Sequence, residues 1–419
     1  MSKHYNVVVI GAGTGGIMTA AQLKNEKKSL SIAIIDPAQT HYYQPAWTLV
    51  GAGTFDYQKT GRPMQSVIPA GCDWIQDAVT TIDAEGNSVA TQNSGSISYD
   101  YLVAAPGIQL DVDGIPGLKE GLEKGVVCSN YTDPNKVWEN VQKFKGGNAI
   151  FTQPTTPIKC GGAPQKIMYL ADDYWAKQGV KNKTKVVFAT PGSVIFGVPE
   201  FAKTLTKVLQ RKEIHFKPFY AITKIDVANK EVHFKNAKPG DNACTVNEGE
   251  GLGERLDGDS TFVLPFDFLH LAPPQSAPDF IKNSPLSNGT PGGWIDVDIN
   301  TLQHNKYPNV FALGDSAALP TAKTGAAIRK QAPVVTANLL AHMENATFSD
   351  KQYEGYSSCP LVTGYGKMVL AEFKYNNERD SDPFLSKFVD TTKENYSMWI
   401  LKKYGLPYLY WNRMMKGKM

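Results

Sequence analysis

Residues 7–16 read Val-Val-Val-Ile-Gly-Ala-Gly-Thr-Gly-Gly, a short apolar run followed by a glycine-rich turn. Its four apolar residues predict a parallel strand covered on both faces, and residues 17–25 predict a helix that begins directly after the glycines. A second apolar strand, residues 31–35, ends at Asp36. A strand, a glycine-rich turn, a helix and an acidic residue at the end of the next strand together predict a dinucleotide-binding unit.

The glycines of this turn and Asp36 have distinct roles in such a unit. Gly11, Gly13 and Gly16 let the backbone approach a pyrophosphate, which also meets the free N–H groups and positive potential at the start of a helix. Asp36 is placed to accept hydrogen bonds from the ribose hydroxyls of the adenosine. A glycine-rich turn without a ligand is the weaker alternative, because the whole sequence context of the motif is present.

Two later segments resemble the shared motifs of flavoproteins that bind two dinucleotides. Residues 104–107 read Ala-Ala-Pro-Gly after an apolar strand, and residues 307–315 read Tyr-Pro-Asn-Val-Phe-Ala-Leu-Gly-Asp. In that group the aspartate, Asp315 here, binds the ribityl chain of the flavin. The resemblance therefore implies FAD, rather than NAD, as the tightly bound cofactor. It also places three further residues beside the FAD: Ala105, Gly107 and Gly314.

A second α/β unit is predicted from the strand at residues 185–190. Related reductases carry a second glycine motif after this strand, which binds NAD(P)H. Here residues 190–197 read Thr-Pro-Gly-Ser-Val-Ile-Phe-Gly, which lacks the glycine spacing and puts bulky residues where phosphates would lie. We therefore expect that the electrons do not come from a nicotinamide, which argues against a type II NADH dehydrogenase and against a disulfide reductase.

The predicted fold class is α/β, with two Rossmann-like domains and a C-terminal membrane-surface segment. Residues 236–260 are rich in Gly, Asn, Asp and Glu and predict a solvated loop. The expected ranges are 1–105 for the first part of the FAD-binding domain, 106–270 for the second Rossmann-like domain, 271–345 for the second part of the FAD-binding domain, and 346–419 for the C-terminal region.

Composition excludes several classes of protein. The chain has 419 residues with 43 basic and 40 acidic side chains, a balance that gives no support for a nucleic-acid partner. The five cysteines are scattered and form no CxxC pair, so we expect neither a metal site nor a disulfide framework. We also expect no signal peptide ahead of residue 7 and no spanning helix, since no apolar run of about 18 residues occurs.

Two cysteines lie in segments that could support redox chemistry. Cys160 stands in a glycine-rich turn directly before a helix expected from about Gln165, with Lys159 and Lys166 nearby. A helix start and neighbouring cations lower the pKa of a thiol and favour the nucleophilic thiolate. Cys359 lies among small residues and is also expected on a turn. Taken singly, either cysteine would more often be inert than catalytic.

Three segments of the chain resemble sulfide:quinone oxidoreductases of the mitochondrial type and their bacterial relatives. They are residues 41–53, which begin His-Tyr-Tyr-Gln-Pro-Ala-Trp, residues 156–170 around Cys160, and residues 358–365 around Cys359. The resemblance implies that Cys160 and Cys359 form the redox-active pair beside the flavin. It assigns these residues to FAD: Gly11, Gly13, Gly16, Asp36, Gln44, Pro45, Asp315 and Lys323, the last beside the N1/O2 edge of the flavin.

The family chemistry sets the expected partners. Hydrogen sulfide, as hydrosulfide, attacks a bridged cysteine pair, and we expect the persulfide on Cys359 and the flavin-reducing thiolate on Cys160. The electrons pass to ubiquinone or menaquinone, and the sulfur leaves on glutathione, sulfite or a growing polysulfide. Cys128 is a candidate third catalytic cysteine, with burial in a strand as the alternative. Cys72 and Cys244 sit in no such motif.

The C-terminal segment from Tyr396 mixes Trp, Tyr, Leu and Met with Lys and Arg, as interfacial membrane segments do. Pro407 is expected to break it into two short pieces, and Lys402 is expected to attract anionic lipid. We therefore expect a peripheral, monotopic protein of the inner or cytoplasmic membrane; a helix packed on its own domain is the alternative. Two alternative functions remain, a flavocytochrome sulfide dehydrogenase and a flavoprotein sensor. Whether the protein forms a homo-oligomer is left open.

Overall fold

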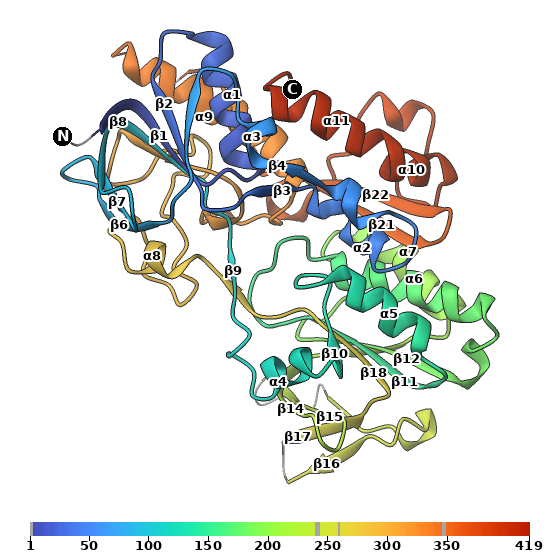
Figure 1. The fold of residues 1–419 in the computed structure, drawn as a ribbon. Helices are drawn as coiled ribbons and strands as arrows, with labels where there is room; N and C mark the ends of the chain where they lie inside the picture. The colour runs from blue at the N-terminus through green and yellow to red at the C-terminus, as the bar shows by residue number, and fades with distance from the viewer. Residues whose placement is uncertain (1–2, 239–243, 259, 346–348) are drawn as a thin grey trace.

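The computed structural model describes residues 3–238, 244–258, 260–345 and 349–419 (Figure 1). A seven-stranded sheet contains the first strands of the chain, in the order β5-β2-β1-β8-β7-β6, with β20 beside β8. Its parallel strands are β1 (Lys3–Ile10), β2 (Ile32–Ile35), β5 (Cys72–Ile75), β8 (Ser96–Ala104) and β20 (Val310–Ala312). Its antiparallel strands are β6 (Val79–Asp83) and β7 (Ser88–Thr91).

Strand β1 is buried because it has core on both faces. Val7 and Val9 pack in one apolar cluster, while Val8 and Ile10 pack in another on the opposite face. The first cluster includes residues of α1 (Thr14–Glu26) and α9 (Gly325–Met343). This is the double cover that the continuous apolar run predicts.

A second sheet has five strands, all parallel. In order across the sheet they are β10 (Val127–Cys128), β18 (Phe268–Leu271), β11 (Gly147–Thr152), β12 (Thr184–Thr190) and β13 (His215–Pro218). The helices of this part are α5 (Pro134–Lys143), α6 (Ala163–Lys177) and α7 (Pro199–Arg211). The expected α/β fold with two parallel Rossmann-like sheets is confirmed. The second unit begins before residue 185, however, and the division into four residue ranges stays a prediction.

Most of the described part of residues 236–260, where a solvated loop is expected, is exposed and lies outside regular elements, but the short strand β16 (Arg255–Asp257) interrupts it. This strand belongs to a four-stranded antiparallel sheet with β14 (Tyr220–Asp226), β15 (Glu231–Asn236) and β17 (Thr261–Pro265). Cys244 and Leu252 are buried in its apolar cluster. Residues 239–243 and 259 lie outside the described residues.

The C-terminal tail is one continuous helical segment, shown in red in Figure 1. It follows the hairpin of β21 (Ser357–Gly364) and β22 (Lys367–Phe373), and comprises α10 (Tyr396–Ile400), a π-helical turn (Leu401–Gly405), α11 (Leu406–Asn412) and a 3-10 turn (Met414–Lys416). Pro407 does not break it. The wider turn, in which Leu406 N donates to Leu401 O, carries the chain into the first turn of α11, where a proline is tolerated.

Short elements complete the fold. They are β3 (Thr40–Tyr42), α2 (Trp47–Val50), β4 (Gly61–Pro63), α3 (Met64–Val67), β9 (Gln109–Leu110), α4 (Leu118–Glu123), β19 (Gln275–Ser276) and α8 (Asp279–Lys282). Among the described residues no helix is both long and apolar enough to cross a membrane. Within the same residues, no group of three or more His, Cys, Asp or Glu side chains is arranged to hold a metal ion.

Candidate active site

Cys160 and Cys359 lie side by side although 199 residues separate them in the sequence. Their Sγ atoms are 3.6 Å apart, and both are free thiols. Cys160 precedes α6, as expected. Cys359 does not lie on a turn: it is buried within the strand β21, which packs against α6. The structure therefore brings the two predicted cysteines together through a helix start and a strand.

The backbone of Cys160 is held in an unusual conformation. Its φ of 84° is in the left-handed region, which costs a non-glycine residue on the order of 1–3 kcal/mol. The turn around it is closed by Ala163 N, which donates to Cys160 O at 2.6 Å, and by Gln153 Nε2, which donates to Gly161 O at 3.1 Å. These bonds fix the thiol at the start of α6, facing β21.

Gly162 makes the approach of the two sulfurs possible. A Cβ atom on this residue would lie 2.5 Å from Cys359 Sγ and 2.5 Å from Leu361 Cδ2, distances that real side chains do not show. At the neighbouring Gly161 the nearest atom to such a Cβ would be 3.6 Å away, an ordinary contact. The sequence motif contained both glycines, but only the structure shows which of them is sterically required.

Electrostatics divide the pair into a thiolate and a thiol. The hydrogen bond from Cys359 lowers the pKa of Cys160 well below its ordinary value, and the charge of Lys166 lowers it further. Lys166 is buried, and its Nζ lies 3.0 Å from Cys160 Sγ. Because Cys359 donates that hydrogen bond and is buried, its own pKa is raised well above the ordinary value. Of the two predicted cations, Lys166 contacts the sulfur and Lys159 does not: Lys159 Nζ donates to Gln44 Oε1 at 2.7 Å.

A second buried amine reaches this region from the tail. Lys402, in the π-helical turn, is only 2% exposed, and its Nζ donates to Pro45 O at 2.8 Å. Burial, together with the charge of Lys166, lowers the pKa of Lys402 to about 7. The charge of Lys402 also contributes to the lowered pKa of Cys160. The expectation that Lys402 faces lipid is therefore wrong, and sequence reasoning missed its place beside the cysteines.

The glycine-rich turn has the shape that a dinucleotide needs. Gly11 has a φ of 94°, and a Cβ there would lie 2.3 Å from Ala105 O. A Cβ on Gly16 would lie 1.9 Å from Gly11 O, so neither glycine can carry a side chain. A Cβ on Gly13, in contrast, would meet no atom within 4 Å. The open side of the turn, at the start of α1, can thus accept a pyrophosphate.

Asp36 lies where the motif predicts, at the end of β2. Its carboxylate accepts hydrogen bonds from Ala12 N at 2.7 Å and from Ala38 N at 2.8 Å, which ties it to the glycine turn. Gly107 and Gly314 both have positive φ angles, of 75° and 81°, at the turns after β8 and β20. These turns close the same edge of the first sheet, because β8 and β20 are parallel neighbours of each other.

Asp315 and Lys323 form a charged group next to the cysteines. Burial raises the pKa of Asp315, while the charges of Lys159 and Lys323 oppose that rise. Burial lowers the pKa of Lys323 to about 8. Its Nζ donates to Ala317 O at 3.1 Å and lies 3.9 Å from the centre of the Trp294 ring. A half-buried carboxylate and a buried amine suit the polar chain and polar ring edge of a flavin, so the residues present fit FAD.

Cys128 occupies a different environment from the pair. It is buried in β10, its Sγ contacts Leu269 O at 3.6 Å, and burial raises its pKa to about 12. The pKa values of Cys72 and Cys244 are each raised to about 11, again chiefly by burial. Cys160 is therefore the one cysteine of the five whose pKa is lowered. A catalytic role for Cys128 stays a prediction.

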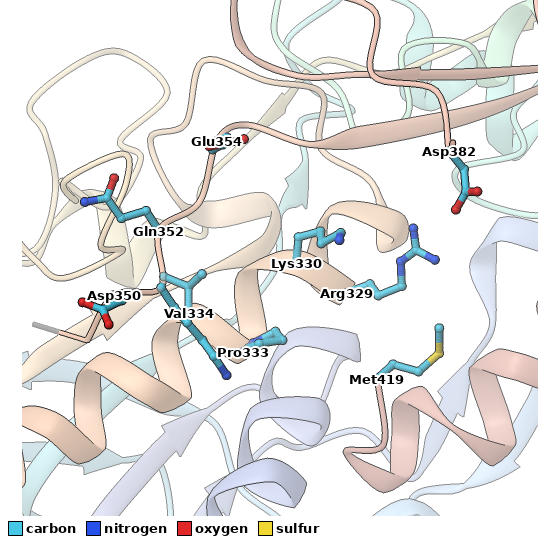
Figure 2. A pocket seen from close by; sticks show the side chains of 10 residues that line it. Arg329, Lys330, Pro333, Val334, Asp350, Gln352, Glu354, Asp382 and Met419 are labelled. Atoms are coloured by element: carbon cyan, nitrogen blue, oxygen red, sulfur yellow. The ribbon is translucent and has the colours of Figure 1, made fainter. Parts of the chain in front are cut away.

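A surface cavity of about 700 Å³ lies away from the cysteines (Figure 2). It is bounded by one side of α9, by residues 350–354, and by Asp382 and Met419. Cationic and anionic side chains are mixed along its wall, so it has no single charge preference. Neither cysteine of the pair lines it.

Several known proteins resemble this chain in sequence and in fold. A family model described as pyridine nucleotide-disulphide oxidoreductase matches residues 5–144. The chain is 41% identical to the mitochondrial sulfide:quinone oxidoreductase of Mus musculus, over 99% of this chain and 87% of that protein. It is 40% identical to the corresponding protein of Dictyostelium discoideum, over 98% of this chain and 86% of that one. The crystal structure of the sulfide:quinone oxidoreductase of Aquifex aeolicus superposes with a TM-score of 0.79 at 21% identity, covering 99% and 92% of the two chains.

The contact at Gly162 predicts the outcome of a glycine substitution. In Gly162→Ala the new methyl group displaces Cys359, so oxidation of the two thiols to a disulfide should slow at least about tenfold, since thiols must come within bonding distance to join. Gly161→Ala is the matched control and should oxidise like the wild type. The measurement is the count of free thiols over time after a mild oxidant is added. Equal rates in the two variants would contradict the steric role of Gly162.

The ion pair predicts a change in the titration of Cys160. A lowered pKa keeps Cys160 ionised at pH values below the ordinary thiol range, so loss of Lys166 should raise the midpoint. In Lys166→Met we expect the pH midpoint of Cys160 alkylation by iodoacetamide to rise by about 1–3 units. Lys177→Met, which removes an exposed lysine of the same helix, should leave the midpoint unchanged. Mass spectrometry of the Cys160 peptide measures both; an unchanged midpoint in Lys166→Met would exclude the proposed charge effect.

Proposed function

The chain belongs to the sulfide:quinone oxidoreductase family, and we propose that it oxidises sulfide at Cys160 and Cys359 and passes the electrons through FAD to a membrane quinone. The observation that carries the proposal is the pair of sulfurs 3.6 Å apart, with Lys166 at 3.0 Å from one of them. Such a pair supplies an electrophilic sulfur when it is bridged and a stabilised thiolate when it opens.

The different pKa values of the two thiols set the direction of the sulfur chemistry. Hydrosulfide attacks the Sγ of Cys359 in the bridged pair, which forms a new S–S bond and breaks the bond to Cys160. The sulfur with the lower pKa is the better leaving group, so the electron pair goes to Cys160 as a thiolate. The product of this step is a persulfide on Cys359 and a thiolate on Cys160 beside Lys166.

The first sheet provides the residues that hold the cofactor. The glycine turn at residues 11–16 receives the pyrophosphate, Asp36 the adenosine ribose, and Asp315 the ribityl chain. Lys323 supplies a positive charge, and Gln44 and Pro45 complete the wall toward the cysteines. When bound, the FAD accepts two electrons from the sulfur centre and delivers them to a quinone. The thiolate of Cys160 must stay ionised until those electrons leave, and the charge of Lys166 keeps it ionised.

The oxidised sulfur and the quinone complete the proposed reaction. Glutathione, sulfite or a growing polysulfide, as a nucleophile, takes the outer sulfur of the persulfide and leaves a thiolate on Cys359. The two cysteine sulfurs then rejoin as a disulfide, and the two electrons that they lose reach ubiquinone or menaquinone. The second sheet supports sulfide rather than a nicotinamide as the electron donor, because residues 190–197 after β12 lack the glycine spacing that binds a second dinucleotide.

A lipid-facing stripe on the tail supports access to a membrane quinone. Tyr396, Ile400, Tyr404 and Tyr408 are all exposed, and their spacing of four places them on one face of the helical segment. A second exposed aromatic pair, at residues 384 and 388, precedes the segment. Aromatic side chains of this kind sit at the level of lipid headgroups. We therefore propose that the protein is peripheral on the inner or cytoplasmic membrane.

The Trp and Met side chains that composition suggested for lipid contact face the protein instead. Trp399 and Trp411 are buried against the protein, as are Met398, Met414 and Met415. Removing the whole tail would also remove the buried Lys402, so substitutions on the exposed stripe are the sharper test.

Anaerobic spectroscopy tests the proposed reaction. Sulfide should bleach the visible flavin band within the mixing time of a manual experiment, NADH should not, and added decylubiquinone should restore the band. Cys160→Ser and Cys359→Ser should each lose this bleaching while they keep FAD, because neither residue lies in the dinucleotide turn. Cys244→Ser, with its buried thiol in the antiparallel sheet, is the control. Reduction by NADH and none by sulfide would refute the assignment.

Vesicle binding tests the membrane face. The double substitution of Tyr404 and Tyr408 by serine should weaken sedimentation with anionic vesicles by about tenfold or more, because each aromatic ring contributes on the order of 1 kcal/mol when it is partly buried. Quinone reduction should fall with it, while flavin reduction by sulfide persists. Leu256→Ser removes an exposed apolar side chain from the antiparallel sheet and serves as control. Vesicle binding equal to the wild type would place the lipid contact elsewhere.

A further inference from the structure

The helix with the lipid-facing stripe turns its other face toward the glycine-rich turn. Tyr410 of α11 is buried, and its hydroxyl has two partners. The oxygen lies 2.6 Å from His41 Nε2 and 2.8 Å from Thr14 Oγ1. Thr14 is the first residue of α1, directly after Gly13, so the tail contacts the proposed pyrophosphate site through one side chain.

His41 extends this contact to a second residue of the turn. It is buried in β3, and its Nδ1 lies 2.8 Å from Ala12 O. A carbonyl can only accept, so Nδ1–H donates to Ala12. Burial lowers the pKa of His41 and favours the neutral ring, whose Nε2 then accepts from the Tyr410 hydroxyl. The Tyr410 oxygen is left to accept from Thr14. The chain of three hydrogen bonds therefore has one consistent direction and starts and ends on the glycine-rich turn.

Packing fixes the tail in this position. The ring of Tyr410 lies 4.6 Å from that of Tyr43, and Arg62 lies 4.2 Å over the ring of Trp411. Further along, Gln22 Nε2 of α1 donates to Met419 O at 2.7 Å. Figure 1 shows α11 running beside the blue N-terminal elements α3 and β4. The tail thus covers the dinucleotide unit as well as presenting a face to lipid.

We propose that Tyr410 is a positioning residue for FAD binding, because it holds Ala12 and Thr14 in the conformation that binds the pyrophosphate. Docking of the C-terminal tail and binding of FAD then stabilise each other. The proposal rests on FAD as the cofactor of the proposed function. Coupling between two binding events is reciprocal, so FAD must hold the tail as much as the tail holds FAD.

The test uses Tyr410→Phe, which keeps the ring and removes both hydrogen bonds of the hydroxyl. Flavin release from the holoenzyme is followed by the rise in flavin fluorescence after dilution into flavin-free buffer. Release should be about tenfold faster than in the wild type, as expected for two buried hydrogen bonds that no other group replaces. Tyr408→Phe, an exposed tyrosine on the same helix, should release flavin at the wild-type rate.

Hydrogen exchange separates coupling from a merely structural role. In the wild type, removal of FAD should speed the exchange of residues 406–419 several-fold; in Tyr410→Phe, exchange there should be the same with and without FAD. The coupling is refuted if Tyr410→Phe releases flavin within twofold of the wild-type rate. It is also refuted if removal of FAD leaves hydrogen exchange of the wild-type tail unchanged. A wild-type protein that retains no FAD overturns the cofactor assignment instead, and removes the coupling with it.

Discussion

The start of α6 packs against the strand β21, and this contact brings the two cysteines together. It places Cys160 against Cys359 across 199 residues of chain, and it is possible only because Gly162 has no side chain. A thiolate held away from water is costly unless a cation compensates it, and Lys166 lies in α6, six residues after Cys160. The turn that precedes α6 thus supplies the thiolate and the close approach, and the helix supplies the compensating charge. The strained backbone of Cys160 is tolerated because this arrangement fixes it.

Sequence reasoning was strongest where one short segment determines its own structure. The glycine turn, Asp36 and the segment that ends at Asp315 can each be recognised from about ten neighbouring residues. The structure places all three at one edge of the first sheet. It failed for Cys359, because serines and a proline around a cysteine are typical of a turn. Pro360 is nevertheless compatible with β21, since among the described residues this strand pairs only with β22 and a proline without an N–H can stand on its open side.

The tail shows a different limit of sequence reasoning. The spacing of four between Tyr396, Ile400, Tyr404 and Tyr408 was readable from the sequence and predicts one exposed helical face. The inner face was not readable, because a lysine such as Lys402 usually lies in water and its burial depends on a carbonyl 357 residues earlier. The tail is consequently neither a free anchor nor a simple terminal helix. Its Lys402 lies near Cys160, and its Tyr410 covers the glycine-rich turn.

The two buried amines tie the charge of the site to the state of the cysteine pair. Burial, and after it the charge of Lys166, lowers the pKa of Lys402 to about 7, whereas negative charge on Cys160 and Cys359 raises it. In the proposed reaction a bridged pair carries no thiolate, so Lys402 then binds its proton more weakly. Opening of the bridge puts a negative charge on Cys160 and strengthens proton binding at Lys402. Proton uptake by the tail therefore accompanies formation of the thiolate.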